Sequence, residues 1–219
     1  MFWLGIDTAT RRGSVALAPA GHLRLLQPGG GHAPELLEAI EALLTSAGAA
    51  AKDLAGIAVA LGPGSFTGVR VGLATAKGLG YSLGIPVDGL SSLELLARAA
   101  GLPKGSLVCA AIEAGRGEVY AARFRVTDEG AARLSEDAAL TPARVRDTLE
   151  GRVFVTGDGA ARVVDAAPDH FIEAPAAPLA PILAAWAVRH LPEGTPYRPG
   201  GPLPNYVRPS DGTPPPPKS

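Results

Sequence analysis

The chain has few of the residues that mark several common classes of protein. Its 219 residues include a single cysteine, Cys109, and only 5% aromatic residues. One thiol can form neither an intrachain disulfide nor a metal site built on paired cysteines. A disulfide-stabilised secreted scaffold is therefore excluded, and a reducing, cytoplasmic location is expected.

Long apolar runs are also missing. No stretch of the sequence is long and apolar enough to span a bilayer. The apolar residues 1–5 are soon followed by the charge of Asp7, so they are too short for the apolar segment of a signal peptide. We expect a soluble protein that has no contact with a membrane.

The sequence lacks an excess of either charge. Lys and Arg number 20 and Asp and Glu 21, a formal net charge of −1. Domains that grip nucleic acid usually carry a basic excess, so direct RNA binding is disfavoured as the main role. The 47% of hydrophobic residues is enough for a sizeable core, in one large domain or two small ones.

Catalytic and metal-binding patterns are missing as well. Histidine occurs four times, and no two histidines are three or four residues apart, as a metal-binding pair on one helix would be (His22, His32, His170 and His190). We interpret His32 as a solvent-facing or helix-capping residue. A metallopeptidase lacks its ligands here, and the sequence around Ser65 lacks the second glycine of the Gly-x-Ser-x-Gly motif of serine hydrolases. We predict no catalytic residue and no metal ligand.

Glycine and proline, in contrast, are abundant, and they meet in one motif, GPGSFTGVR at residues 62–70. The apolar residues 56–60 before it predict a buried strand, and apolar or small residues recur at helical spacing after it. The motif is therefore a tight turn between a strand and a helix. Glycine allows a positive φ and a close backbone approach, and Ser65 or Thr67 could cap the helix.

Such a turn has two interpretations. Free N–H groups at a helix start favour an anion, so a nucleotide phosphate could bind there. The turn could equally be purely structural, because the lysine of a P-loop is missing. The residues that would lie near a nucleotide are Asp7, Thr8, Gly62, Gly64, Ser65, Thr67 and Gly68.

The predicted elements of the first hundred residues run β-β-β-α-β-α-β-α. Three strands (2–7, 14–18 and 23–27) precede a helix that starts at Pro34 and stops near Gly48; a strand at 85–90 and a helix with a Ser91–Glu94 capping box end the series. This order is typical of actin-like ATPase and ribonuclease-H-like folds, by analogy. We therefore predict a two-lobed α/β fold.

The second half of the chain opens with a hairpin of strands at 107–113 and 118–126, which repeats the start of the first half. A short helix to Leu149, a strand at 153–156 and a final helix at 181–191 follow. We expect a degenerate duplication with a smaller second lobe. The domains are then 1–101, 102–191, and a Pro/Gly-rich tail at 192–219 that is extended or disordered, with an anchor at 206–208.

Asp7, at the end of the first strand, is the carboxylate most relevant to nucleotide binding. In actin-like ATPases the turn at this point reads Asp-x-Gly-Thr/Ser, whereas here Ala9 takes the place of the glycine. Asp7 is either a structural turn carboxylate or a nucleotide-proximal one. The second alternative would make the chain an independent actin-like ATPase or phosphotransferase that uses Asp7 and the loop from Gly62 to Gly68.

The GPGSFTGVR motif closely resembles the signature of the bacterial TsaB (YeaZ) family. Three shorter runs follow in matching order: IDTAT at 6–10, GEVY at 117–120 and GDG at 157–159. The resemblance implies a noncatalytic partner of TsaD, which works with the ATPase TsaE and transfers threonylcarbamoyl from its adenylate to adenosine-37 of ANN-decoding tRNAs. It also implies a homodimer when the chain is alone, contact with tRNA only through the complex, and no cofactor of its own, with ATP or ADP and Mg at a partner interface.

Two expectations about particular residues accompany the resemblance. The family usually has an aspartate where this chain has Glu113, so no role at that position is carried over. A partner is expected to pack on two helices with apolar or small faces. Their residues are Leu36, Leu37, Ile40, Leu44, Val69, Leu73, Ala76, Leu79 and Gly80.

Overall fold

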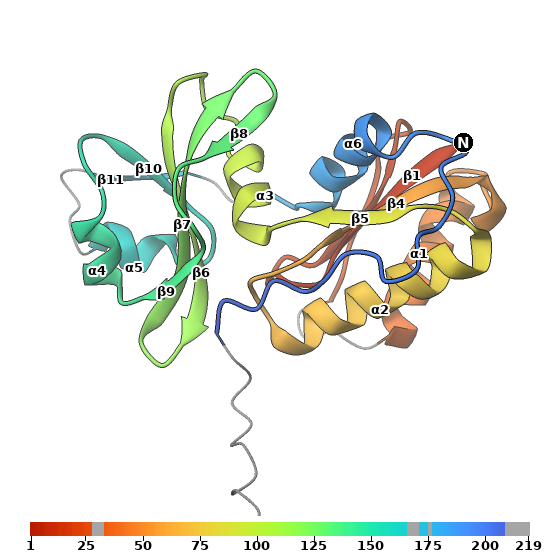
Figure 1. The fold of residues 1–219 in the computed structure, drawn as a ribbon, viewed down its shortest axis with the longest axis horizontal. Helices are drawn as coiled ribbons and strands as arrows, with labels where there is room; N and C mark the ends of the chain where they lie inside the picture. Colours follow the sequence, from red (N-terminus) through yellow and green to blue (C-terminus); the bar gives the residue numbers. More distant parts are fainter. Residues whose placement is uncertain (28–32, 166–170, 175–176, 209–219) are drawn as a thin grey trace, which may run out of the picture.

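Two β-sheets lie side by side in the computed structural model, which describes residues 1–27, 33–165, 171–174 and 177–208 (Figure 1). The first sheet has the strand order β3-β2-β1-β4-β5. Its antiparallel pairs are β1/β2 and β2/β3, and its parallel pairs are β1/β4 and β4/β5. The strands are β1 (Phe2–Asp7), β2 (Ser14–Ala18), β3 (His22–Leu25), β4 (Leu54–Ala60) and β5 (Val87–Leu90).

Helices cover both faces of the first sheet. On one face, α1 (Ala33–Ser46) and α2 (Phe66–Leu83) form an outer layer over a core of large aliphatic side chains; a short 3-10 helix, η1 (Ala51–Asp53), precedes β4. On the other face lies α6 (Ala180–His190), whose alanines pack on Ala16. A Cβ at Gly5 would lie 2.1 Å from the Ala180 carbonyl oxygen, so this close approach requires glycine.

The second sheet repeats the topology of the first. Its order is β11-β10-β6-β7-β8, with β9 added beside β7. The pair β6/β7 is antiparallel and β6/β10 is parallel, as β1/β2 and β1/β4 are. The duplication is therefore confirmed in the order and direction of the strands. They are β6 (Leu107–Gly115), β7 (Glu118–Thr127), β8 (Gly130–Arg133), β9 (Ala138–Leu140), β10 (Val153–Thr156) and β11 (Phe171–Ala174).

The second lobe is smaller in its helices and not in its sheet. Its own helices, α4 (Pro142–Asp147) and α5 (Ala160–Asp165), have 6 residues each, against 14 in α1 and 18 in α2. Thr141 caps α4 as expected, since its Oγ1 accepts a hydrogen bond from the Arg144 N–H at 3.3 Å.

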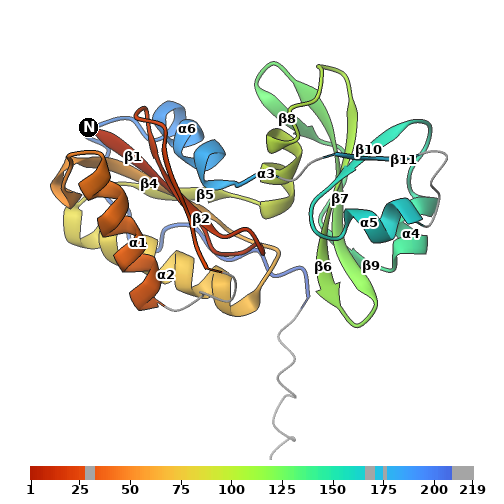
Figure 2. The ribbon, with the colours of Figure 1, turned by 180° about the vertical axis from the view of Figure 1, so that it is seen from behind.

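Two helices cross between the lobes. Helix α3 (Ser92–Ala99) follows the first sheet in sequence but packs on β6, β7 and β8, while α6 packs on β1, β2 and β4 (Figure 2). One apolar cluster joins their residues, including Leu96 and Phe124 on one side and Leu183 on the other. A division at residue 101 therefore separates the sheets but not the helices that cover them.

Helix α3 begins without the capping box that the sequence predicts. The Ser91–Glu94 capping box is wrong: Ser91 makes no side-chain cap, its Oγ donates to Asp137 Oδ2 at 3.0 Å, and Glu94 pairs with Arg98. Both side chains bind charged partners instead of the backbone at the start of α3.

The elements β8, β9, α5 and β11 were not predicted, because each has six residues or fewer and no clear apolar period.

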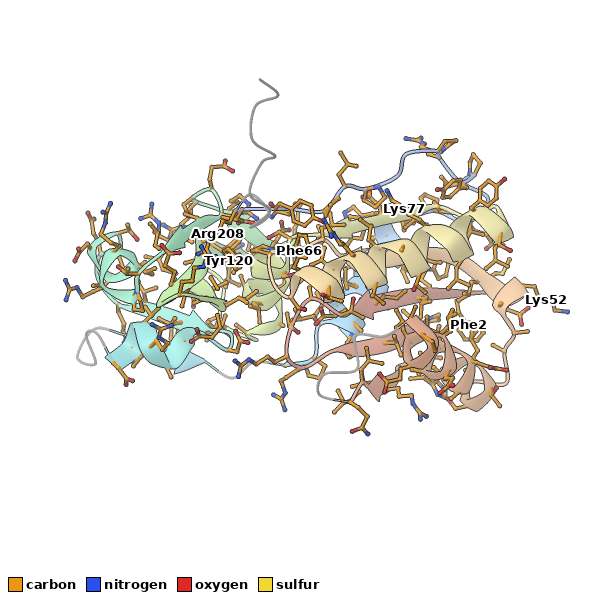
Figure 3. The ribbon with its side chains drawn as sticks, turned by 90° about the horizontal axis from the view of Figure 1, so that it is seen from below. Phe2, Lys52, Phe66, Lys77, Tyr120 and Arg208 are labelled. Carbon is orange, nitrogen blue, oxygen red and sulfur yellow. The ribbon has the colours of Figure 1, made fainter. Side chains whose placement is uncertain are left out.

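The tail is extended as far as the structure describes it. Residues 192–208 contain no helix or strand and run back along α2 towards the second sheet (Figures 1 and 3). The expected anchor at 206–208 is present, since the Tyr206 ring lies 5.5 Å from that of Phe66. The rest of the tail, with its proline run, lies outside the described residues. Within the described ranges, no helix has both the length and the hydropathy needed to cross a membrane.

Candidate functional site

The glycine loop connects β4 to α2, as the sequence predicts. Helix α2 begins at Phe66, and Ser65 is its N-cap: Ser65 Oγ accepts a hydrogen bond from the Gly68 N–H at 3.2 Å. Thr67, the other candidate cap, is exposed on the first turn. Ser65 is therefore the capping residue.

The loop packs directly against the β1–β2 turn. Built Cβ atoms at Gly64 and Gly68 would lie 2.2 Å from the Ala9 carbonyl oxygen and 1.9 Å from the Thr8 carbonyl oxygen. The Ser65 N–H donates to the Ala9 carbonyl at 2.8 Å, and Thr8 Oγ1 donates to the Gly68 carbonyl at 2.7 Å. The glycines thus allow the loop and the β1–β2 turn to pack closely, and hydrogen bonds in both directions join the two segments.

Asp7 is fully engaged within its own turn. Its side chain is buried; Oδ1 accepts from the N–H groups of Ala9 at 2.9 Å and Thr10 at 3.2 Å, and Oδ2 accepts from Thr10 Oγ1 at 2.6 Å. Burial raises the pKa of the Asp7 carboxyl, and these hydrogen bonds oppose the rise. This arrangement is that of a carboxylate that closes a turn.

Several polar groups predicted to lie near a nucleotide already have partners within the chain. The Asp7 carboxylate has no exposed surface, and the N–H groups of Ser65 and Gly68 are hydrogen-bonded to the Ala9 carbonyl and to Ser65 Oγ. Among the described residues no group of three His, Cys, Asp or Glu side chains could hold a metal ion. His32 and His170 lie outside the described residues.

Ser65 lacks the surroundings of a nucleophile. A hydrolytic serine needs a base within hydrogen-bond reach. The two described histidines have other neighbours: His22 Nδ1 lies 3.1 Å from Ser46 Oγ, and the His190 ring stacks on Trp186. Ser65 Oγ instead accepts the capping hydrogen bond.

Most side chains predicted for a partner interface face the core of the chain itself, which corrects their assignment to a surface. The periodicity identified an apolar face on each helix, and the first sheet covers that face. Leu37 is 46% exposed and Leu79 is partly buried. The buried residues are Leu36, Ile40, Leu44, Val69, Leu73, Ala76 and Gly80.

The outer surface of α1 and α2 is made by other residues. On α2 the exposed positions include Thr67, Ala74 and Gly78, and a Cβ added at Gly78 would meet no atom within 4 Å. On α1, Leu37 and Glu41 are exposed. We name this set the α1/α2 outer face.

A charged link between the lobes was not predicted. Arg11, in the β1–β2 turn, pairs with Asp158 at 3.3 Å, and Asp158 Oδ1 accepts from the Glu113 N–H at 2.9 Å. Burial raises the pKa of the Asp158 carboxyl, and Arg11 and the Glu113 N–H oppose the rise. Glu113 itself pairs with Arg162 of α5 at 3.0 Å. The sequence analysis singled out the GDG run and Glu113, but no local sequence pattern predicts their connection with Arg11, which is more than 100 residues away.

Comparisons with known proteins point in one direction. Residues 29–157 match the family model described as TsaD, tRNA N6-adenosine threonylcarbamoyltransferase. The chain is 37% identical over 153 residues to a tRNA threonylcarbamoyladenosine biosynthesis protein TsaB of Escherichia coli, covering 67% of this chain and 65% of that protein. A TsaB protein of Bacillus subtilis is 43% identical over 94 residues, 43% of this chain and 41% of the relative. The chain thus spans between about two fifths and two thirds of these relatives.

Solved structures extend the likeness over nearly the whole chain. A protein described as similar to peptidase YeaZ from Pseudomonas aeruginosa superposes with a TM-score of 0.75 and 29% identity, covering 94% of this chain and 99% of that one. The structure described as YeaZ from Pseudomonas aeruginosa gives 0.68 and 30%, covering 87% and 94%. The actin-like arrangement of the two lobes agrees with these neighbours.

Proposed function

The chain belongs to the TsaB (YeaZ) family, and we propose that it serves tRNA threonylcarbamoyladenosine biosynthesis as the noncatalytic partner of a TsaD-like protein. One observation carries the noncatalytic part. The glycine loop, which in an actin-like ATPase would face the nucleotide, packs here against the β1–β2 turn, and the Asp7 carboxylate is hydrogen-bonded within that turn. The transfer of threonylcarbamoyl to adenosine-37 of the tRNA then belongs to the TsaD-like partner, with a TsaE-like ATPase.

The α1/α2 outer face is the proposed partner surface. Its small residues, Ala74 and Gly78, would allow a helix of the partner to approach α2 closely, and Leu37 on α1 supplies an exposed apolar side chain. Both helices lie on the side of the first sheet that α6 does not cover (Figures 1 and 2). Two copies of this chain could use the same face, so a homodimer would compete with the heterodimer.

The remaining roles follow from the partnership. With a net charge of −1, the chain is proposed to meet tRNA only within the complex. We propose no cofactor of its own; ATP or ADP with Mg would sit at the interface with the partner. We propose that the protein acts in the cytoplasm, as a role in tRNA modification suggests.

Binding to the partner tests this surface. Ala74→Glu puts a long charged side chain on the α1/α2 outer face, and Ala185→Glu makes the same change at an exposed position of α6, on the opposite face of the sheet. Calorimetric titration with the TsaD-like protein should show at least about tenfold weaker binding for Ala74→Glu, about 1.4 kcal/mol, and unchanged binding for Ala185→Glu. Equal affinities of the two folded variants would contradict the proposed surface.

A further inference from the structure

The end of the described chain lies across both lobes. We name residues 197–208 the C-terminal strap. It runs along α2, where the Tyr197 N–H donates to the Gly84 carbonyl at 3.1 Å and Lys77 Nζ donates to the Gly200 carbonyl at 2.8 Å (Figure 3). Further on, the Asn205 N–H donates to the Leu61 carbonyl at 2.7 Å, at the start of the glycine loop.

Aromatic and cationic contacts fix the strap on the first lobe. The Arg70 guanidinium lies 3.6 Å from the centroid of the Phe66 ring, and Arg70 Nε donates to the Tyr206 hydroxyl at 2.9 Å. The first contact lies within α2, where an exposed cation–π contact contributes about 0.5–1 kcal/mol and orients the Arg70 side chain. The second contact, from Arg70 to Tyr206, joins α2 to the strap.

The same few strap residues also bind the second lobe. Asn205 Nδ2 donates to Asp137 Oδ2 at 2.6 Å, and Asp137 is nearly buried beside its partner Arg133. Arg208 forms an ion pair with Glu118 of the β6–β7 hairpin and lies 5.9 Å from the Tyr120 ring centroid (Figure 3). Between Asn205 and Arg208 the chain thus passes from one lobe to the other.

The strap has the character of a releasable element. None of residues 197–208 is fully buried. Tyr197 packs against the apolar core of the first lobe, and the bridging residues beyond it are held by exposed or part-buried hydrogen bonds, ring contacts and one ion pair. Interactions of this kind contribute about 1 kcal/mol each, far less than a buried side chain network. Segments held in this way open locally without global unfolding.

We propose that the C-terminal strap is an intrachain clasp that limits the angle between the two lobes. Actin-like folds have two lobes around a junction, and in this chain residues 205–208 bridge that junction on the side of the glycine loop. The Arg11–Asp158 pair and the shared apolar cluster join the lobes elsewhere. Release of the strap leaves those contacts as the pivot and frees the lobes to rotate. This inference does not depend on the proposed partner or on tRNA.

Pulsed electron spin resonance on the full chain tests the proposal, because the distance between one spin label on each lobe changes with the angle between the lobes. Spin labels at Lys52→Cys and Glu150→Cys would report on the first and second lobes, since both positions are exposed. Cys109, the natural thiol, is buried and its pKa is raised to about 12 by that burial, so it stays unlabelled in the folded chain. The distance distribution then reflects the two introduced labels alone.

The decisive comparison is between two truncations. A chain that ends at Pro202 lacks the bridging residues, whereas a chain that ends at Arg208 keeps them and loses only residues 209–219. We expect the distribution to broaden or shift in the chain ending at Pro202 and to match the full chain in the one ending at Arg208. Equal distributions in all three would overturn the proposal.

A second variant keeps the test decisive if the shorter chain fails to fold. The double substitution Asn205→Ala and Arg208→Ala removes the bonds to Asp137 and Glu118 but keeps the length of the strap. Its distribution should broaden as well. An unchanged distribution in this folded variant would equally overturn the clasp.

Discussion

At the scale of single residues, the loop glycines are explained by contact within the chain. Gly64 and Gly68 stand where any side chain would collide with the backbone of Ala9 or Thr8. The sequence predicted the turn and its cap, because glycine and serine have strong local preferences. The sequence did not show which group approaches the loop, because close contact with a phosphate and close contact with a neighbouring strand end both require glycine.

A pair of glycine substitutions in α2 tests this explanation. Gly68→Ala places a methyl group 1.9 Å from the Thr8 carbonyl oxygen, so it should lower the free energy of unfolding by at least about 2 kcal/mol. Gly78→Ala meets no atom within 4 Å and should raise it by about 0.5–1 kcal/mol through helix propensity. Urea unfolding of both variants is the measurement, and equal effects would contradict the packing described for the loop.

Asp7 makes a prediction about pH. Because burial raises its pKa above the ordinary value of 3.8, the folded chain keeps the proton to higher pH than the unfolded chain does. The stability contributed by the protonated form is therefore lost as pH rises from about 3.8 through the raised pKa, with a slope of at most about 1.4 kcal/mol per pH unit. Asp158 shifts in the same direction.

Asp7→Asn isolates this contribution. The variant cannot ionise at position 7, so its free energy of unfolding should improve relative to the original chain as pH rises above about 4. Urea titrations at several pH values between about 4 and 7 give the difference directly. A difference that stays constant with pH would show that Asp7 does not titrate in this range.

At the scale of elements, helical periodicity identified the apolar faces of α1 and α2 correctly but not their neighbour. A buried face can pack on the chain's own sheet or on another protein, and the period is the same in both cases. Here the first sheet covers the apolar face of each helix, so a partner could contact only exposed positions such as Leu37 and Ala74. Their exposure depends on tertiary packing, which a period alone does not supply.

Two adjacent leucines of α1 separate the two roles. Leu36 is fully buried, so Leu36→Glu should cost at least about 3 kcal/mol and leave little folded protein. Leu37 is 46% exposed, so Leu37→Glu should change stability by no more than about 0.5 kcal/mol but weaken binding to the TsaD-like partner. Thermal unfolding and gel filtration with the partner check both. Loss of folding in Leu37→Glu would contradict the assignment of this residue to the outer face.

At the scale of the whole molecule, the strand order of the first sheet could be expected from the order of elements along the chain. The packing of α3 on the second sheet and of α6 on the first could not be expected, because nothing in the sequence of either helix indicates which sheet it covers. The strap was predicted only as an extended tail with an anchor. Its bridge depends on pairs such as Asn205 with Asp137, 68 residues apart, which no local pattern connects.

The central claim is that this chain supports a transfer reaction that it does not perform. The direct measurement is reconstituted threonylcarbamoylation of tRNA with the TsaD-like and TsaE-like proteins and threonylcarbamoyl adenylate, with and without this chain. We expect modification to require the chain, to be reduced by Ala74→Glu and not by Ala185→Glu, and to be absent with the chain alone, which should also hydrolyse no ATP. Modification that proceeds equally well without the chain would contradict the account, as would ATP hydrolysis by the chain alone that Asp7→Asn abolishes.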